Sequence, residues 1–302
     1  MKLYAPKYYK QFKCIADKCR HSCCVGWEID VDPDAMEKYA SLSGGYSGKI
    51  RASIDVGETP HFRLAENEKC PHLDEHGLCR IISEYGEGFL CDICREHPRF
   101  YNDTIHGKEV GIGMSCEEAA RIILSSGEYR EMLVIDEIDG EVIDTEFDAT
   151  VYRKKLYEIL SSDKITYTEK LACLYDILGF SLDSFSDEKY AEFLNSLEYL
   201  DESHRMMFAV YSSTLVTPKK CEKALEHALA YFIYRHCTSA EDEAEFLAAL
   251  GFSLFCERLL ASLFNANKAR NIDEMADLAR IVSEEIEYSE ENTETVKMFF
   301  ME

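Results

Sequence analysis

The sequence predicts a mostly α-helical protein, in which an irregular, cysteine-rich, metal-binding N-terminal part with short strands precedes an α-helical domain. Nine of the 13 cysteines lie in residues 1–116, together with 11 of the 15 glycines and five of the six prolines. Beyond residue 151, apolar residues recur at three- and four-residue spacing, as in amphipathic helices. We therefore expect a cysteine-cluster metal-binding domain at 1–126, a connector or β-hairpin at 127–150, and an acidic helical domain at 151–302.

Composition and charge narrow the class of protein. The 302 residues are 46% hydrophobic and 30% charged, which is typical of a globular chain. The first residues lack the apolar segment of a signal peptide, and no 18 consecutive apolar residues occur. We expect a cytoplasmic protein that has neither a membrane nor a nucleic acid as partner. The net charge of −24 is concentrated in residues 117–302, which carry 39 acidic and 18 basic side chains.

The cysteine-rich part shows only short regular elements. We predict a strand-like segment at residues 27–31 and a strand pair within 102–114, with His106-Gly107 at the turn. The stretch SLSGGYSGKI, residues 41–50, is predicted to be a flexible loop. No strand is predicted before it and it lacks a P-loop lysine pattern, so we do not expect it to hold a phosphate.

A helix is predicted to begin at Ser115. Ser115 and Glu118 have the S-x-x-E spacing of a capping box, ahead of an apolar face formed by Ala119, Ile122 and Ile123. After this helix, two strands around Asp139-Gly140 or a linker would fill the connector.

The remaining chain is predicted to be helical almost throughout. Thr168 and Ser186 are candidate N-caps. The four cysteines of this part lie among Leu, Ala, Tyr and Phe, so they are predicted to be small buried hydrophobic residues. They are Cys173, Cys221, Cys237 and Cys256. The predicted helices span 151–161, 168–179, 187–199, 201–213, 219–236, 241–265 and 272–288.

The N-terminal cysteines have the spacing of metal ligands. They follow the pattern C-x4-C-x3-C-C, then C-x8-C, then C-x2-C, then a single cysteine. Thiols stay reduced in the cytosol, so metal binding is favoured over disulfides. Four thiolates suffice for a tetrahedral zinc ion or a 4Fe–4S cluster. The cysteines are Cys14, Cys19, Cys23, Cys24, Cys70, Cys79, Cys91, Cys94 and Cys116.

Neighbouring residues add detail to this constellation. CPHLDEHGLC is predicted to be a ligand loop that turns at Gly77, and Arg95 and Arg99 either offset thiolate charge or form ordinary ion pairs. Neighbouring side chains of an extended chain point to opposite faces. We therefore expect one of the adjacent Cys23 and Cys24 to bind metal while the other packs, or the two to serve different centres.

Three other kinds of site are less favoured by the spacing. A radical S-adenosylmethionine motif, C-x3-C-x2-C, would need a cysteine where Gly26 stands. Thioredoxin-like chemistry at the C-x2-C pair would need a βαβ setting, which the pattern does not show. Four histidines lie near cysteines, and a solvated loop is favoured over ligation for each, although a mixed Cys/His site stays open. These histidines are His21, His72, His76 and His97.

Three motifs carry a resemblance to a known family. CIADKCRHSCCVGWEI, CPHLDEHGLCRI and LCDICREHPRFY, in this order, resemble the flagellin lysine-N-methylase family and a broader group with a zinc- or iron-chelating cysteine cluster. The resemblance covers about residues 4–124. It also includes the sole tryptophan, Trp27, and the pair Pro98-Arg99. A structural role explains these residues as well as a functional one does: Trp27 as an anchor in the core, and Pro98-Arg99 as a turn.

The resemblance implies a methyltransferase that modifies lysine ε-amines of flagellin with S-adenosylmethionine and contains an iron–sulfur cluster, with zinc as the alternative metal. No Rossmann-type glycine fingerprint for the methyl donor is present, since Gly111-Ile112-Gly113 is only a fragment of one. The donor pocket and the catalytic base are therefore not assigned. The resemblance carries over eight ligands, with Cys91 a less certain ninth: Cys14, Cys19, Cys23, Cys24, Cys70, Cys79, Cys94 and Cys116.

Two further classes of function would also account for the cysteine cluster. One is a metal-stapled binding protein without catalysis, and the other, less favoured because of the large helical part, is an electron carrier. For the methyltransferase, the net charge of −21 over residues 117–302 would attract lysine-bearing surfaces from a distance. The target amine would enter an apolar, tyrosine-lined mouth near the junction of the two parts.

Overall fold

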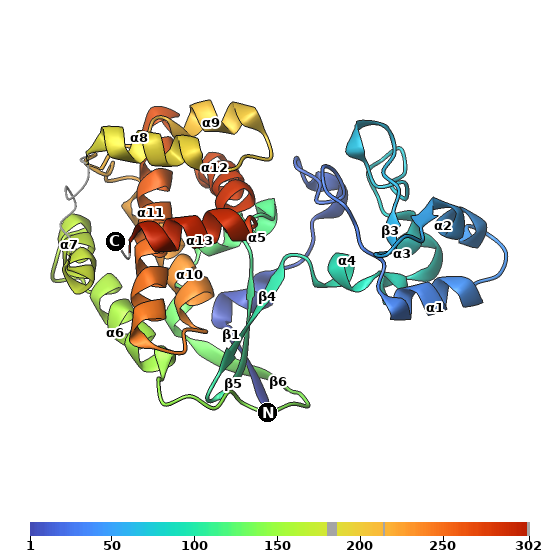
Figure 1. Cartoon of the computed structure of the whole chain (residues 1–302), viewed down its shortest axis with the longest axis horizontal. Helices are drawn as coiled ribbons and strands as arrows, with labels where there is room; N and C mark the ends of the chain where they lie inside the picture. Colours follow the sequence, from blue (N-terminus) through green and yellow to red (C-terminus); the bar gives the residue numbers. More distant parts are fainter. Residues whose placement is uncertain (180–185, 214, 301–302) are drawn as a thin grey trace. The chain divides into compact units, whose positions relative to one another are not determined.

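The computed structural model describes residues 1–179, 186–213 and 215–300. Two compact units account for the chain: the cysteine unit, Lys13–Arg99, and the helical unit, which joins Met1–Phe12 to Phe100–Glu302 (Figure 1). The first 12 residues and residues 100–126 therefore pack with the C-terminal helices, although composition groups them with the cysteines. The predicted boundaries at 126 and 150 stay a prediction.

The cysteine unit is built from short elements around a small core. Asp32 positions two of its helices: one carboxylate oxygen accepts from the Ala35 N–H and caps α1, and the other accepts from the Asp92 N–H at the start of α4. The core includes Ile29, Tyr39 and Phe62. The elements are α1 (Pro33–Ser41), α2 (Ser47–Ser53), β2 (Ile54–Asp55), β3 (His61–Phe62), α3 (Arg80–Tyr85) and α4 (Asp92–Glu96).

Two predictions for this unit are wrong. Residues 27–31 form no strand; the chain there makes only an isolated bridge from Asp30 to His61, and another bridge, from Val25 to Lys69, lies just before it. The predicted loop 41–50 contains the end of α1 and the start of α2, and its turn is confined to the residues around Gly44 and Gly45, which both have positive φ. Tertiary packing therefore overrides the weak local signal in this glycine-rich stretch.

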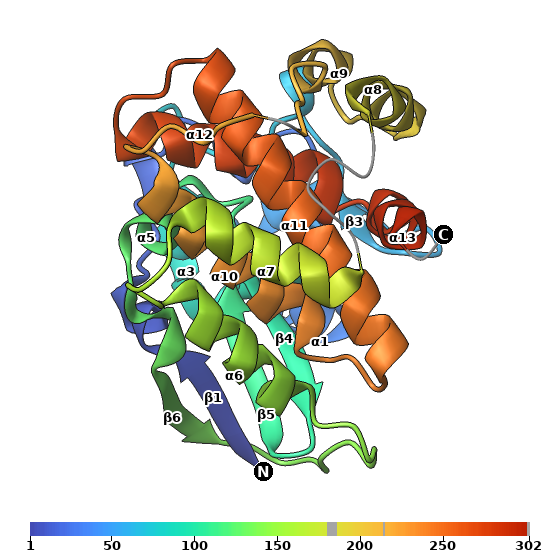
Figure 2. The same ribbon diagram turned by 90° about the vertical axis from the view of Figure 1, so that its left-hand side faces the viewer.

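A small mixed sheet lies at one edge of the helical unit, with α6 in front of it in the view of Figure 2. Its strand order is β4-β5-β1-β6, and β1 runs parallel to β5 and antiparallel to β6. The predicted strand pair around His106-Gly107 is confirmed as β4 and β5. Only one strand forms in 127–150, and a connector without strands follows it. The strands are β1 (Lys2–Pro6), β4 (Arg99–Thr104), β5 (Gly107–Ile112) and β6 (Met132–Glu137).

The predicted helices of the C-terminal part are confirmed, with shifted ends. The last one closes in a π-helical turn, Ser283–Glu287, and a further helix follows that the periodicity did not reveal. They pack around one large core, in which α10 lies along α11. The helices are α5 (Glu117–Ser125), α6 (Ala149–Leu160), α7 (Tyr167–Leu178), α8 (Asp187–Ser196), α9 (Glu202–Phe208), α10 (Glu222–Cys237), α11 (Glu243–Ala266), α12 (Ile272–Val282) and α13 (Glu290–Phe299).

The predicted helix caps have mixed outcomes. Ser186 caps α8 as predicted, because its hydroxyl accepts from the Lys189 N–H. Thr168 does not cap α7; Thr166 does, in a complete capping box with Glu169. The capping box predicted at Ser115 is also wrong.

In place of Ser115, Cys116 is the N-cap of α5, without a side-chain bond to the helix, and the Ser115 hydroxyl is buried without a hydrogen-bond partner. The predicted apolar face of α5 is buried: Ala119, Ile122 and Ile123.

Helix α11 is the central element of the helical unit. By length and composition it could cross a membrane, but 94% of its apolar window is buried inside the protein. Such burial is typical of a helix in the core of a large folded unit. Gly251 on α11 lets Phe300 approach, since a Cβ there would lie 2.6 Å from the Phe300 Cβ.

Three of the four helical cysteines match the prediction. Cys221, Cys237 and Cys256 are fully buried, whereas Cys173 is exposed on α7, so its prediction is wrong. Periodicity placed Cys173 on an apolar stripe, but the buried stripe of α7 is formed by other residues, among them Leu171 and Leu174.

A buried ion pair joins the sheet to the helices. Arg153 on α6 donates from its two terminal nitrogens to the two carboxylate oxygens of Glu109 on β5, at 2.7 and 2.9 Å, and both side chains are 7% exposed. It also donates to Thr238, just after α10. Burial alone would lower the pKa of Arg153, and the Glu109 charge outweighs this, so the pKa is raised. Arg153 therefore keeps its charge inside the protein, where both Glu109 carboxylate oxygens accept hydrogen bonds from it.

We predict that Arg153→Met strongly destabilises the helical unit. The substitution leaves the Glu109 carboxylate buried without its partner, which costs about 3–5 kcal/mol of unfolding free energy. Urea unfolding followed by circular dichroism measures the loss. The double variant Arg153→Met/Glu109→Gln is the control and should recover part of it; equal stability of wild type and the single variant would contradict the prediction.

Candidate metal centre and adjoining pocket

Five thiols share the core of the cysteine unit. Cys70 and Cys91 are buried members of that core, and three half-buried cysteines pack against it: Cys24, Cys79 and Cys94. They come from three segments far apart in the sequence. The structure thus gathers four of the eight ligands that the resemblance implies, and adds Cys91, which had been the least certain.

Backbone hydrogen bonds bring these segments together. The Cys70 N–H donates to the Cys24 carbonyl at 2.8 Å, and Leu73 bridges to Cys79 across the loop between the second and third thiol. That loop turns at Gly77, as predicted: Gly77 has a φ of 77°, and its N–H donates to the Asp74 carbonyl. The loop therefore carries one thiol at each of its ends.

Backbone N–H groups point at two of the sulfurs. Burial raises the pKa of Cys70 to about 12, against a hydrogen bond from the His72 N–H. Burial also raises the pKa of Cys79, against hydrogen bonds from the N–H groups of Ile81 and Ile82. Such donors stabilise a thiolate, and a bound metal ion would supply the remaining stabilisation.

The last two core thiols contact each other. A hydrogen bond between them lowers the pKa of Cys91 and raises that of Cys94. Burial and the nearby Cys91, Cys24 and Cys70 thiols raise the pKa of Cys94 further. Cys91 and Cys94 are therefore a hydrogen-bonded thiol pair within the core of the cysteine unit.

The other predicted ligands lie outside this group. Cys14 is exposed, Cys23 is exposed and touches the group through a hydrogen bond to Cys24, and the Cys19 thiol donates to the His21 carbonyl at 3.0 Å. Cys116 belongs to the helical unit, where it packs against the large core at the start of α5. Across the described ranges, no three His, Cys, Asp or Glu side chains converge closely enough to hold a metal ion.

Adjacent Cys23 and Cys24 do not follow the extended geometry expected for them. They lie in a turn, and a hydrogen bond from the Cys23 side chain lowers the pKa of Cys24 to about 7. The premise that their side chains point to opposite faces is therefore wrong, because the chain is bent here.

Two of the four nearby histidines are not solvated loop residues. His72 is 1% exposed, and its ring nitrogens lie 3.2 Å from the Tyr46 hydroxyl and 3.0 Å from the Ser53 hydroxyl. Both nitrogens are thus used within the fold. His97 lies against the Trp27 ring, with 6.0 Å between ring centroids. The other two, His21 and His76, are exposed as predicted.

Arg95 is an ion-pair partner. It pairs with Asp92 and Glu96 on its own helix, α4, and its backbone carbonyl accepts from the Arg99 guanidinium. Of the two roles left open for these arginines, the structure shows the ordinary ion pair for Arg95.

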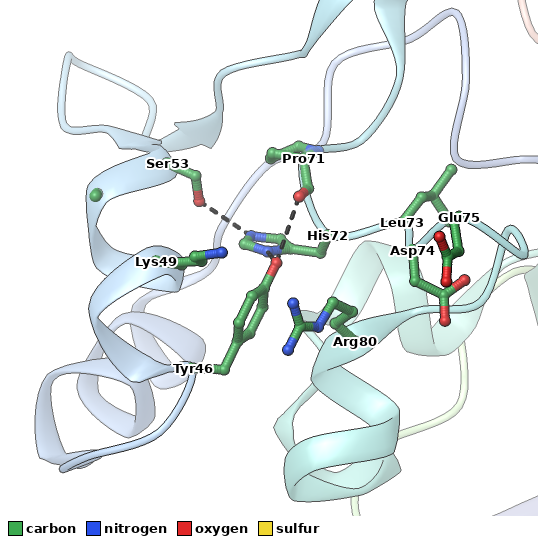
Figure 3. Close-up of a pocket in the computed structure, with 10 residues that line it drawn as sticks. Tyr46, Lys49, Ser53, Pro71, His72, Leu73, Asp74, Glu75 and Arg80 are labelled. Atoms are coloured by element: carbon green, nitrogen blue, oxygen red, sulfur yellow. Dashed lines mark hydrogen bonds between the residues drawn. The ribbon is translucent and has the colours of Figure 1, made fainter.

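A pocket of about 750 Å³ adjoins the cysteine core (Figure 3). One wall is α2 with its N-cap, and the other is the start of the ligand loop and of α3. Burial raises the pKa of Tyr46 in this pocket, and the Cys70 and Cys79 thiols add to the rise, so the pocket and the thiols are neighbours. The lining residues include Tyr46, Lys49, Ser53, Asp74 and Arg80.

No pattern in the sequence predicts this pocket. Tyr46 and Lys49 lie in the stretch interpreted as a flexible loop, and Arg80, which follows Cys79, lies 31 positions after Lys49. The one available signal was the presence of an aromatic and a basic residue within a glycine-rich segment.

A second cavity of about 640 Å³ lies in the helical unit, between its sheet and α6. The buried Arg153–Glu109 pair lines it, and Tyr4, Arg130 and Lys154 are among the other residues around it. Its charged wall is thus part of the ion-pair network that stabilises the unit.

Comparison with known proteins finds three relatives from Salmonella. The chain is 26% identical over 133 residues to a lysine-N-methylase of Salmonella choleraesuis and 25% identical over 133 residues to one of Salmonella typhimurium. The chain resembles the lysine-N-methylases. Each match covers 40% of this chain but only 32% of the methylase, so the chain spans about a third of the length of these relatives.

A third relative adds a flagellar name. The flagellar biosynthetic protein FliU of Salmonella muenchen is 26% identical over 127 residues, which are 40% of this chain and 75% of FliU. No protein-family profile matches the chain, and no solved structure matches it. The resemblance to the lysine-N-methylases is therefore one of sequence alone.

We predict that alkylation will separate the cysteines by burial. In protein purified under reducing conditions, Cys14 and Cys173 should react first, because their side chains are exposed. Cys91 and Cys256 should be protected in the folded protein, since both are buried. Timed iodoacetamide labelling with peptide mass spectrometry measures the rates, and labelling in urea is the control. Equal rates for Cys173 and Cys256 in the folded protein would contradict the structure.

Proposed function

We propose that the chain is a protein-lysine N-methyltransferase that modifies flagellin, with S-adenosylmethionine as methyl donor and a cysteine-held iron–sulfur cluster. The observation that carries the proposal is the resemblance to two proteins named lysine-N-methylase. The flagellar name of the third relative supports flagellin as the substrate.

The thiols of the cysteine core are the residues that would hold the metal. Four thiolates suffice for a 4Fe–4S cluster or a zinc ion, and the core offers five, with backbone N–H donors at two of the sulfurs. When bound, the centre would join the three segments of the unit and, as iron–sulfur, supply one-electron redox chemistry. The proposed donors are Cys24, Cys70, Cys79, Cys91 and Cys94.

The proposed reaction sets a requirement on charge. A neutral lysine amine attacks the methyl carbon of the sulfonium, the carbon–sulfur bond breaks, S-adenosylhomocysteine leaves, and the amine loses its proton to a base or to water. A carboxylate paired directly with the amine would keep it protonated. We therefore assign to the excess of acidic residues in 117–302 the role of attracting lysine-bearing surfaces from a distance.

The experiment is methyl transfer in vitro. Anaerobically purified protein of verified iron and sulfide content is incubated with labelled S-adenosylmethionine and the flagellin of its own host, at low and high salt. Label on flagellin lysines that decreases as salt rises is the expected result, because salt screens long-range attraction. Transfer that salt does not change would retain the enzyme and exclude steering by charge. Absence of label, together with absence of donor binding, would instead favour a metal-stapled binding protein.

We predict that Cys94→Ser lowers the metal content while Cys173→Ser does not. Cys94 lies in the thiol core, and Cys173 is exposed on α7. Because metal binding and folding are coupled, the Cys94 variant should also become protease-sensitive within residues 13–99 and keep the helical content of the helical unit. Elemental analysis and limited proteolysis with mass spectrometry provide the two measurements. Full metal content in the Cys94 variant would remove Cys94 from the ligand set.

A further inference from the structure

We propose that the pocket beside the cysteine core binds the α-amino-acid end of the methyl donor, with its carboxylate at Lys49 and Arg80 and its ammonium at Asp74. The inference rests on the proposed function, because it places that function's donor in a cavity of this chain. A volume of about 750 Å³ is within the range of small-molecule sites.

Two cations meet at one aromatic ring. The Arg80 guanidinium carbon lies 4.1 Å from the centroid of the Tyr46 ring, and the Lys49 Nζ lies 5.8 Å from the same centroid. Arg80 is fixed further by a 2.9 Å bond to Glu84, one turn along α3. In the close-up, Lys49 and Arg80 extend toward the Tyr46 ring from opposite walls (Figure 3). A small anionic group beside this ring would be attracted by both cations.

A carboxylate lines the same pocket beyond Arg80. Asp74 uses its Oδ1 to accept from the N–H groups of His76 and Leu78, which fixes the side chain at the turn of the ligand loop. Asp74 and Arg80 both line this pocket, on the side of it formed by the ligand loop and the start of α3. Glu75 lines the pocket as well but is mostly exposed. The pocket is therefore positive at the tyrosine ring and negative at the loop.

This charge pattern selects the class of ligand. Lys49 and Arg80 would attract a simple anion such as phosphate, but Asp74 would repel it. Asp74 would attract a simple cation, and the two basic residues would repel it. A zwitterion with a carboxylate and an ammonium on one carbon satisfies both ends. The wall between the charges is uncharged: Pro71 and Leu73 line it, and both ring nitrogens of His72 are already used. An aliphatic chain next to the amino-acid group fits such a wall.

Calorimetry with S-adenosylhomocysteine tests the site without turnover. The titration uses the full chain, purified anaerobically, and compares Lys49→Met with Lys154→Met, which changes a lysine of the second cavity in the helical unit. Lys49 is exposed, so its replacement should not affect folding. We expect Lys49→Met to weaken binding about tenfold or more, which is typical of losing a charged hydrogen bond. Lys154→Met should bind as the wild type does.

Fragments of the donor give a second readout. Free methionine should compete with S-adenosylhomocysteine, and the affinity for adenosine should be the same in wild type and Lys49→Met, because adenosine has neither charge. Asp74→Asn, which keeps the turn acceptor, should weaken the binding of methionine.

Each other outcome overturns the inference in a recognisable way. Tight binding of S-adenosylhomocysteine that Lys49→Met and Asp74→Asn leave unchanged would remove the donor from this pocket while the proposed function stands. Weakening by Lys154→Met alone would move the donor to the second cavity. No binding to the wild type, with the metal content verified, would overturn both this site and the proposed function.

Discussion

The packing of five thiols against one small core is the constraint on which the cysteine unit depends. Its longest helix has nine residues, so regular backbone hydrogen bonding contributes little to its stability. Sulfur atoms from three distant segments take positions that larger apolar side chains fill in an ordinary core. This core is small for a unit of this length, so the buried apolar surface contributes little stability. A metal ion that cross-links the sulfurs would add stability.

The helical unit is stabilised differently. Its core is formed by long helices with continuous apolar faces, and charged groups inside it are paired, as Lys170 is with Glu226 and Arg153 with Glu109. The first pair joins α7 to α10 and the second joins α6 to β5, so each favours one particular packing of these elements, because a buried charge is costly unless its own partner is present. The two units therefore differ in what specifies their packing. Packing of sulfur atoms specifies it in the cysteine unit, and apolar burial together with ion pairs specifies it in the helical unit.

The parts of the fold that could be predicted are those with a repeating local signal. Helices after residue 151 and the strand pair at His106-Gly107 have such signals, whereas α1 to α4 are too short to show a period. The parallel pairing of Leu3 with Lys108 depends on tertiary contact and is not encoded locally. Cysteine spacing indicated a thiol site, but not that Cys91 lies in the group and Cys14 outside it. The pocket depends on residues 31 positions apart, which no local pattern joins.

The cysteine unit interrupts the helical unit in the sequence, because residues 1–12 and 100–302 fold together around it. Strand β1 needs β5 on one side and β6 on the other, and its last partner is residue 137. During synthesis, the first strand must therefore remain without its partners until the whole cysteine unit has left the ribosome. The interrupting segment has a core of its own, so it can fold before the sheet of the surrounding unit closes. The order of the segments along the chain therefore favours folding of the thiol core before folding of the large helical core.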